Sequence, residues 1–364
     1  MLTIKNLSIP GYETVIEAED SSTGLSCYIA IHDTTLGPAL GGTRIFPYLN
    51  KEEALHDVLR LAKAMTYKSA VASDGLGGGK SVIIANPKKD KTEKLLLSFG
   101  EVINSLKGAY IAAEDVGSTI EDMTVIRKKT PYVAALPTDK SSGDPSRFTA
   151  WGVFRGIQAV LKKVWHTHSL KKKVVSISGV GNVGSKLANI LFWEGADLIL
   201  SDTDQKKVHE QAILYGARVV SPEEAYQVEC DIFSPCSLGG VLSESSVPLL
   251  KCKAVAGAAN NQLSDSECGK LLMKRNILYA PDYIINAGGI LNAAAEFDPG
   301  GYDPTIARDR VNHIYDTLRY VFNKADFENK PTSQIADELA EHKLQYGIGK
   351  RRVPIFFEGA RYKG

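Results

Sequence analysis

The chain has 364 residues, of which 44% are hydrophobic and 23% are charged, and its formal net charge is +1. This length exceeds that of most single domains, so we expect two domains. The balanced charge excludes a large basic surface for binding nucleic acid. Because the first residues lack an apolar signal core and no apolar run approaches the ~20 residues of a membrane helix, we expect a cytoplasmic protein with neither a membrane nor a nucleic-acid partner.

The N-terminal third alternates predicted strands and helices, as an α/β layer does. Apolar runs predict strands at 27–33, 81–85 and 109–113. Helical spacing of apolar residues predicts helices at 52–67 and 95–106. A turn-rich stretch is expected at 37–42, and Lys68 is expected at the C-terminal end of the first helix.

A glycine-rich segment predicts a loop that ends in Lys80, twelve residues after Lys68. Its sequence, at 75–80, is Gly-Leu-Gly-Gly-Gly-Lys. Glycine lets backbone approach a small molecule closely. A second cation beside Lys80 would lower its pKa, so that the amine could act as a base near neutral pH. Asp115, after the predicted strand at 109–113, is a candidate for proton transfer. Taken singly, Lys68 could be a surface lysine, Asp115 a helix cap, and the glycines before Lys80 a simple turn.

Residues 74–81 also approach the Gly-x-x-x-x-Gly-Lys-Ser pattern of phosphate-binding loops. Position 74 is Asp, however, and its carboxylate would repel phosphate. The pattern further requires a strand before it and a helix after it, whereas the residues after Lys80 predict a strand. These departures disfavour a nucleoside triphosphatase.

The second part of the chain begins after a stretch rich in Pro, Ser, Gly and Asp at 137–145, which predicts a domain connection. A helix is predicted at 150–161, and a second α/β series begins at Lys173. Its predicted strands are 174–178, 198–201, 218–220, 231–233, 254–256 and 277–279. Helical stretches separate several of them, which indicates a doubly wound sheet.

A dinucleotide fingerprint follows the first of these strands: Gly179, Val180, Gly181, Asn182, Val183 and Gly184 spell Gly-x-Gly-x-x-Gly before a predicted helix. The glycines allow a tight turn, close approach of a pyrophosphate and helix–strand packing, and the helix N-terminus meets the phosphate charge. Asp202, 18 residues after Gly184, would accept from the adenosine ribose and repel a 2′-phosphate. We therefore expect NAD rather than NADP, although the positive charges of Lys206 and Lys207 could partly offset the negative charge of Asp202.

The five cysteines are odd in number, scattered, and never spaced as Cys-x-x-Cys. Disulfide frameworks and most cysteine metal sites need paired or clustered cysteines. We expect reduced, mostly buried thiols and no metal site.

Six motifs follow one another along the chain: Met65-Thr66-Tyr67-Lys68, 77–80, Glu114-Asp115-Val116-Gly117, 179–184, Asn260-Asn261-Gln262 and 281–289. Together they resemble the amino acid dehydrogenases of the glutamate/leucine/phenylalanine/valine family, and the leucine branch is the most similar. The resemblance implies that an L-amino acid, water and NAD⁺ are converted reversibly to a 2-oxo acid, ammonium and NADH. It also implies a homo-oligomer.

The resemblance assigns roles to matching residues. Lys68 would pair with the substrate carboxylate, Lys80 would activate the attacking water, and Asp115 would shuttle protons. Asn261 would help to hold the nicotinamide half of the cofactor. The residues around the substrate side chain would be Leu40, Gly41, Ala113, Ile290 and Ala293.

The predicted side-chain pocket is apolar, so an acidic side chain would be buried there without a partner. This favours leucine and other branched-chain amino acids over glutamate. Ala293 is smaller than the valine usual in the leucine branch, so an aromatic substrate, phenylalanine or tryptophan, is one alternative. A catalytically silent NAD-binding sensor is the other.

These observations predict an α/β fold in three segments. Residues 1–136 form a substrate-binding, catalytic and oligomerisation domain of the α/β type. Residues 145–330 form a doubly wound Rossmann domain that binds NAD, and residues 331–364 form a C-terminal helical segment.

Overall fold

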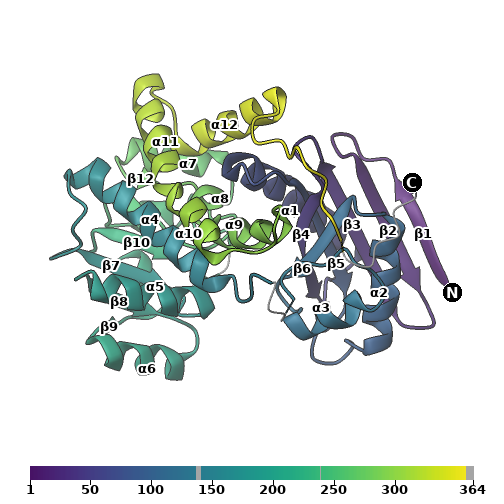
Figure 1. The fold of residues 1–364 in the computed structure, drawn as a ribbon. Coiled ribbons are helices and arrows are strands. Elements are labelled where there is room, and N and C mark those ends of the chain that lie inside the picture. The colour runs from purple at the N-terminus through teal and green to yellow at the C-terminus, as the bar shows by residue number, and fades with distance from the viewer. Residues whose placement is uncertain (137–140, 238, 358–364) are drawn as a thin grey trace. The chain divides into compact units, whose positions relative to one another are not determined.

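The computed structural model describes residues 1–136, 141–237 and 239–357, which fall into two compact units (Figure 1). Unit 1 comprises Met1–Asp144, Ala293–Pro304 and Ala340–Gly364, and unit 2 comprises Pro145–Asn292 and Thr305–Leu339. Residues 137–140 of the predicted connection and the last residues of the C-terminal segment lie outside the described residues. Within the described ranges, no helix combines the length and the apolar character needed to cross a membrane.

Unit 1 is built on a mixed sheet with the strand order β1-β2-β3-β5-β4-β6. Strands β1, β2, β3 and β5 pair antiparallel in turn, whereas β4 is parallel to both β5 and β6. The strands are β1 (Leu2–Leu7), β2 (Thr14–Asp20), β3 (Leu25–Asp33), β4 (Ala39–Phe46), β5 (Gly77–Ile84) and β6 (Tyr110–Glu114).

Three helices cover the two faces of this sheet: α1 (Lys51–Ala72), α2 (Glu93–Ser105) and α3 (Ile120–Arg127). One cluster of buried side chains joins α1 to strand residues such as Val15 and Tyr28. The other joins α2 and α3 to strand residues such as Ile16, which follows Val15 on β2. Successive strand residues point to opposite faces, so α1 lies on one face and α2 with α3 on the other.

Helix α1 continues beyond the predicted end at residue 67. Asn50 caps its start by accepting the Glu53 N–H at 2.8 Å, and Ser73 closes it in the left-handed region at φ 53°. Lys68 therefore lies inside the helix, half-buried, and not at its terminus.

Two glycine-rich segments that we predicted as a turn and a loop are strands of this sheet, so both predictions are wrong. Residues 37–42 largely belong to β4, and residues 75–80 largely belong to β5. A Cβ added at Gly78 would lie 2.0 Å from the Thr66 backbone nitrogen of α1. Glycine is required here because the helix and the strand approach too closely for a side chain, and not because the backbone turns.

Unit 2 has an all-parallel sheet with the strand order β12-β11-β10-β7-β8-β9. Its strands are β7 (Val174–Ser178), β8 (Asp197–Ser201), β9 (Arg218–Val219), β10 (Ile232–Pro235), β11 (Ala254–Val255) and β12 (Leu278–Tyr279). All six predicted strands are confirmed, with small differences at their ends. The strand order reverses beside β7, where doubly wound sheets bind their ligands.

The remaining helices connect these strands or follow the sheet. They are α4 (Ser146–Trp165), α5 (Asn182–Trp193), α6 (Gln205–Tyr215), α7 (Ser266–Lys274), α8 (Asp282–Ile285), α9 (Gly288–Ala294), α10 (Pro304–Asn312), α11 (Ile314–Glu328) and α12 (Thr332–Tyr346), with short 3₁₀ turns η1 (Glu224–Tyr226), η2 (Val247–Leu249) and η3 (Ala295–Phe297). The predicted fold class, an N-terminal α/β domain plus a doubly wound parallel-sheet domain, is confirmed.

Arg351 is one of several C-terminal residues of unit 1 that bind its N-terminal part; another is Lys343, whose Nζ donates to the Val71 carbonyl at 2.8 Å. The Arg351 N–H donates to the Leu36 carbonyl at 2.8 Å. Its side chain donates from Nε to the Gly75 carbonyl at 3.0 Å and from Nη1 to the Phe297 carbonyl at 2.7 Å. Arg351 therefore joins three segments of unit 1 that are far apart in the sequence.

Candidate active site

In unit 1 the sheet brings Lys80 and Asp115 into direct contact. Strand β4 lies between β5 and β6 and is parallel to both. Its Thr43 pairs with Ser81 of β5 and with Glu114 of β6, so Lys80 and Asp115 lie on either side of β4. Lys80 Nζ lies 2.9 Å from Asp115 Oδ2, and the two side chains are 7% and 19% exposed. A nearly buried ammonium is thus matched by a carboxylate.

Gly42, on β4, makes room for this pair. A Cβ added at Gly42 would lie 2.7 Å from the Asp115 Cβ and 3.1 Å from Lys80 Nζ. Contacts of these lengths are closer than packed carbon atoms tolerate. The backbone of β4 therefore forms a wall against both functional groups, and a side chain at this position would displace one of them.

Arg44 is a second cation on the same carboxylate: its Nε donates to Asp115 Oδ2 at 3.1 Å. Burial raises the pKa of Asp115, but the charges and hydrogen bonds of Lys80 and Arg44 outweigh burial, so the pKa lies below its ordinary value. Asp115 is therefore ionised at neutral pH. The direct partner of Lys80 is thus this carboxylate, and Arg44 is a cation on the same oxygen.

Three of the predicted pocket residues also lie on β4 and β6. Leu40 and Gly41 are buried on β4, and Ala113, on β6, pairs with Gly42 across the sheet. Ala293 is buried in unit 1, and Ile290 is buried on α9 within unit 2. Lys68 is on α1, which packs against β3 and β5.

The glycine fingerprint forms the turn between β7 and α5 in unit 2. Gly179 has φ 102°, and a Cβ there would lie 2.8 Å from the Ser237 backbone nitrogen. A Cβ at Gly184 would lie 1.9 Å from the Gly179 carbonyl oxygen. Gly179 and Gly184 are thus fixed by the close packing of the turn.

Gly181 differs from them, because no heavy atom lies within 4 Å of its added Cβ. It is the N-cap of α5 and has no side chain to bond the first N–H groups of the helix. An open glycine beside a helix N-terminus leaves room for a phosphate to approach the backbone. The turn, including Val180, Asn182 and Val183, therefore fits the pyrophosphate of a dinucleotide.

Asp202 follows β8 and faces the same turn. Its Oδ2 accepts the Val180 N–H at 2.7 Å, and its Oδ1 accepts the Asp204 N–H at 2.9 Å. Thr203 Oγ1 also donates to Oδ1, at 3.4 Å. A carboxylate has about four acceptor positions, so these three bonds leave capacity for a ribose hydroxyl. The acid is thereby oriented before any ligand binds.

Asn261 lies in a segment of unit 2 that buried amides hold in place. Asn261 has φ 50°, and its carbonyl accepts the Gly240 N–H at 2.7 Å. The fully buried Gln262 side chain donates to two backbone carbonyls, and Asn286 Nδ2 donates to Asn260 Oδ1 at 2.8 Å. Sequence reasoning noted Gln262 and Asn286 as parts of motifs but did not identify them as supports of Asn261.

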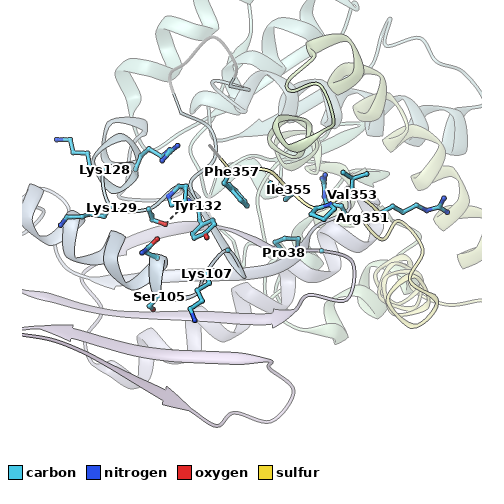
Figure 2. Close-up of a pocket in the computed structure, with 18 residues that line it drawn as sticks. Pro38, Ser105, Lys107, Lys128, Lys129, Tyr132, Arg351, Val353, Ile355 and Phe357 are labelled. Atoms are coloured by element: carbon cyan, nitrogen blue, oxygen red, sulfur yellow. Dashed lines mark hydrogen bonds between the residues drawn. The ribbon is translucent and has the colours of Figure 1, made fainter. Parts of the chain in front are cut away.

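A separate pocket of about 1120 Å³ lies in unit 1 and includes none of the predicted site residues. Figure 2 shows it between the segment around Lys107, the segment from Lys128 to Tyr132, and the C-terminal residues from Arg351 onward. The Tyr132 and Phe357 rings meet edge to face there, with centroids 4.9 Å apart.

Comparison with known proteins settles the family. Residues 12–132 match the dimerisation domain of Glu/Leu/Phe/Val dehydrogenases, and residues 197–313 match the Glutamate/Leucine/Phenylalanine/Valine dehydrogenase model. The chain belongs to this family. It is an NAD(P)-dependent amino acid dehydrogenase, and the N-terminal match indicates assembly with further copies of itself.

Relatives with different substrates in their names are similarly close. The chain is 46% identical to leucine dehydrogenase of Geobacillus stearothermophilus, over 99% of this chain and 97% of that protein. It is 43% identical to phenylalanine dehydrogenase of Caldalkalibacillus thermarum, over 98% and 97% of the two chains. The crystal structure of L-tryptophan dehydrogenase from Nostoc punctiforme matches with a TM-score of 0.79 and 42% identity, covering 93% of this chain and 97% of that one.

Proposed function

We propose that this dehydrogenase acts on leucine and other branched-chain L-amino acids, with NAD as its cofactor, and forms the 2-oxo acid and ammonium reversibly. The contact between Lys80 Nζ and Asp115 Oδ2 is the observation that carries this proposal. It places an amine and a carboxylate together beside the apolar residues Leu40 and Ala113. The 46% identity to leucine dehydrogenases supports the branched-chain assignment.

Each residue of the pair has one role in this proposal. In its neutral form, Lys80 takes a proton from the water that attacks the substrate iminium carbon. Asp115 carries protons to and from the substrate nitrogen. Lys68 binds the substrate carboxylate as its counter-ion. Leu40, Gly41, Ala113, Ile290 and Ala293 contact the substrate side chain, and burying an acidic side chain against them would leave its charge unpaired.

The cofactor would be held by residues of unit 2. The backbone from Gly179 to Gly184 would bind the pyrophosphate, Asp202 the adenosine ribose, and Asn261 the nicotinamide half. When bound, the nicotinamide accepts or returns the hydride. Since Asp202 offers negative charge where NADP carries a 2′-phosphate, NAD is the favoured cofactor.

An aromatic substrate is the second candidate. The identities to phenylalanine and tryptophan dehydrogenases, 43% each, are close to that for leucine dehydrogenases. Ala293 also offers less bulk than a valine would. One methylene of fit is worth only ~1–3 kcal/mol in discrimination, so the enzyme should accept several apolar side chains. We further propose a cytoplasmic homo-oligomer.

The test is NADH formation, followed by absorbance, with leucine, isoleucine, valine, phenylalanine and tryptophan in turn. We expect the highest kcat/KM for a branched-chain amino acid, and a lower rate when NADP⁺ replaces NAD⁺. A higher kcat/KM for phenylalanine or tryptophan would establish the aromatic alternative. Absence of NADH with all five would favour a silent NAD-binding sensor.

The role of Lys80 is tested by substituting this residue. Lys80→Ala should lower kcat for leucine by ~10²-fold or more, because a general base contributes on that order. Lys94→Ala removes an exposed lysine of α2 and should leave kcat unchanged. A Lys80→Ala enzyme with the wild-type rate would contradict the role assigned to Lys80.

A further inference from the structure

Arg44 and Lys80 donate to the same oxygen of Asp115. The Arg44 Nε lies 3.1 Å and the Lys80 Nζ lies 2.9 Å from Asp115 Oδ2. Because both donors share Oδ2, Oδ1 is left for another partner. Proton transfer by Asp115 in the proposed reaction would use this second oxygen.

Arg44 is itself held by a network from α1 and the end of β4. Its Nη1 donates to Asp57 Oδ2 at 2.8 Å, and the same oxygen accepts the Tyr48 hydroxyl at 2.7 Å. Arg60 Nη2 donates to Asp57 Oδ1 at 3.1 Å. The side chains of Arg44 and Asp57 are 22% and 15% exposed. The guanidinium is therefore fixed at two nitrogens, between two carboxylates that are both largely buried.

The two cations on Asp115 differ in what happens to them during the reaction. A general base must be uncharged when it takes a proton, so Lys80 has to be neutral for part of the cycle. At that moment its positive charge no longer compensates the buried carboxylate. A guanidinium keeps its charge at every pH at which enzymes work. Arg44 is thus the permanent cation at Oδ2.

We propose that Arg44 is a positioning residue, which keeps Asp115 ionised and oriented while Lys80 is uncharged, and that Asp57 and Tyr48 hold Arg44 in place for this purpose. The proposal rests on the proposed function in one respect, namely that Lys80 loses its proton during turnover. Arg44 has a second effect. It neutralises part of the carboxylate charge that would otherwise hold the proton on Lys80.

Two other titratable groups near Asp115, both in the described part of β6, carry no positive charge. Glu114 precedes it on β6, and burial, Asp144, Glu121 and Asp115 raise the pKa of Glu114. Tyr110, also on β6, is fully buried, and burial raises its pKa. Lys80 on β5 and Arg44 on β4 are the cations whose charges lower the pKa of Asp115.

The test compares Arg44→Gln with Arg60→Gln by the pH dependence of kcat/KM for leucine deamination. Without Arg44 the full carboxylate charge favours the ammonium form of Lys80. The acid limb of the Arg44→Gln profile should therefore move to higher pH by about one unit, the shift that one adjacent charge produces. Arg60→Gln removes an arginine from the same Asp57 without touching Asp115, so its acid limb should stay at the wild-type position.

A second readout does not depend on activity. The ¹³C signal of the Asp115 carboxyl group, identified by its loss in Asp115→Asn, should titrate at higher pH in Arg44→Gln than in the wild type. Arg44→Lys keeps the charge but has one nitrogen where two are used, so its profile should lie between those of the wild type and Arg44→Gln. If Arg44→Gln does not fold, Asp57→Asn should still shift both readouts in the same direction.

The results separate this proposal from the proposed function. An acid limb and a carboxyl titration that are both unchanged in Arg44→Gln would overturn the role of Arg44. If the wild-type protein forms NADH with none of the amino acids, the proposed function fails. The carboxyl titration then decides the proposal. If the Asp115 carboxyl titrates at the same pH in Arg44→Gln as in the wild type, the proposal is overturned. If it titrates at a higher pH in Arg44→Gln, the electrostatic role of Arg44 is supported.

Discussion

The contact between Lys80 and Asp115 depends on a residue that has no side chain. Gly42 stands so close to both groups that an added Cβ would lie 2.7 Å from the Asp115 Cβ and 3.1 Å from Lys80 Nζ. Its φ is outside the left-handed region, so backbone conformation does not require glycine here. The requirement comes from the space that Asp115, Lys80 and the Glu114 carbonyl oxygen, 2.8 Å from the added Cβ, occupy.

We therefore expect Gly42→Ala to impair catalysis much more than folding. Displacing a reacting group by about 1 Å can cost ~10²-fold in rate, and overpacking costs about 1–3 kcal/mol of stability. Steady-state kinetics with leucine should show a lower kcat, while thermal unfolding shows a moderate decrease in melting temperature. A Gly42→Ala enzyme with unchanged kcat would show that the pair tolerates displacement.

At this scale the sequence predicted which residues to examine but not their partners. Lys80 and Asp115 stand out through their motifs and through the strand that precedes Asp115. The bond from Arg44 to Asp115 joins positions 71 residues apart. It follows from the placement of β4 beside β6, which no local pattern encodes. The same is true of the contact between Lys80 and this carboxylate.

At the scale of elements, glycine serves two different purposes in this chain. In β5, an added Cβ at Gly78 would lie 2.0 Å from the Thr66 nitrogen and 2.3 Å from its Cα, both backbone atoms of α1. In the turn before α5, the Cβ position of Gly181 is open. The first glycine allows an element to pack, and the second leaves space for a ligand.

Matched alanine variants should separate these two purposes. Gly78→Ala should destabilise the protein by about 1–3 kcal/mol or more, because the clash is with backbone that cannot rotate away. Gly181→Ala should leave the melting temperature close to that of the wild type but weaken NAD binding, measured by calorimetry or fluorescence quenching. Equal melting temperatures for the two variants would contradict this distinction.

The secondary structure was predictable where side chains alone determine it. Strands of unit 2 such as β7 and β8 consist of apolar, often β-branched residues bounded by turn residues, and their positions were predicted closely. Strand β4 and the start of β5 were missed because glycine disfavours strands and normally indicates turns. In this protein, tertiary packing against α1 and neighbouring strands overrides that local preference. Strands β1 and β2 were not predicted either.

At the scale of the whole molecule, buried carboxylates link stability to pH. Burial raises the pKa of Asp57, but the Tyr48 hydroxyl, Arg44 and Arg60 outweigh it, so the pKa of Asp57, like that of Asp115, lies below its ordinary value. A carboxylate whose pKa is lower in the folded state binds fewer protons there than in the unfolded state. Its contribution to the free energy of unfolding is therefore complete above the unfolded pKa of ~3.9 and is lost as pH falls through the folded pKa.

Urea unfolding at a series of pH values should detect this linkage. Asp57→Asn should be less stable than the wild type at pH ~6. The difference should shrink as the pH falls below ~4, where the unfolded-state carboxylate takes up a proton, and should vanish once the pH passes below the lower folded-state pKa of Asp57. For Asp309→Asn, which changes an exposed carboxylate of α10, the difference from the wild type should stay small throughout. A pH-independent difference for Asp57→Asn would contradict the assigned linkage.

Arg351 also has a consequence for how the protein is made. Leu36 and Gly75 are synthesised early, whereas the arginine that binds their carbonyls is synthesised 276 residues after Gly75. The residues of unit 2 are therefore synthesised before Arg351 can make its contacts within unit 1. A transcript truncated before Arg351 would therefore yield a polypeptide whose N-terminal sheet is fully encoded but lacks the bonds that join Leu36, Gly75 and Phe297.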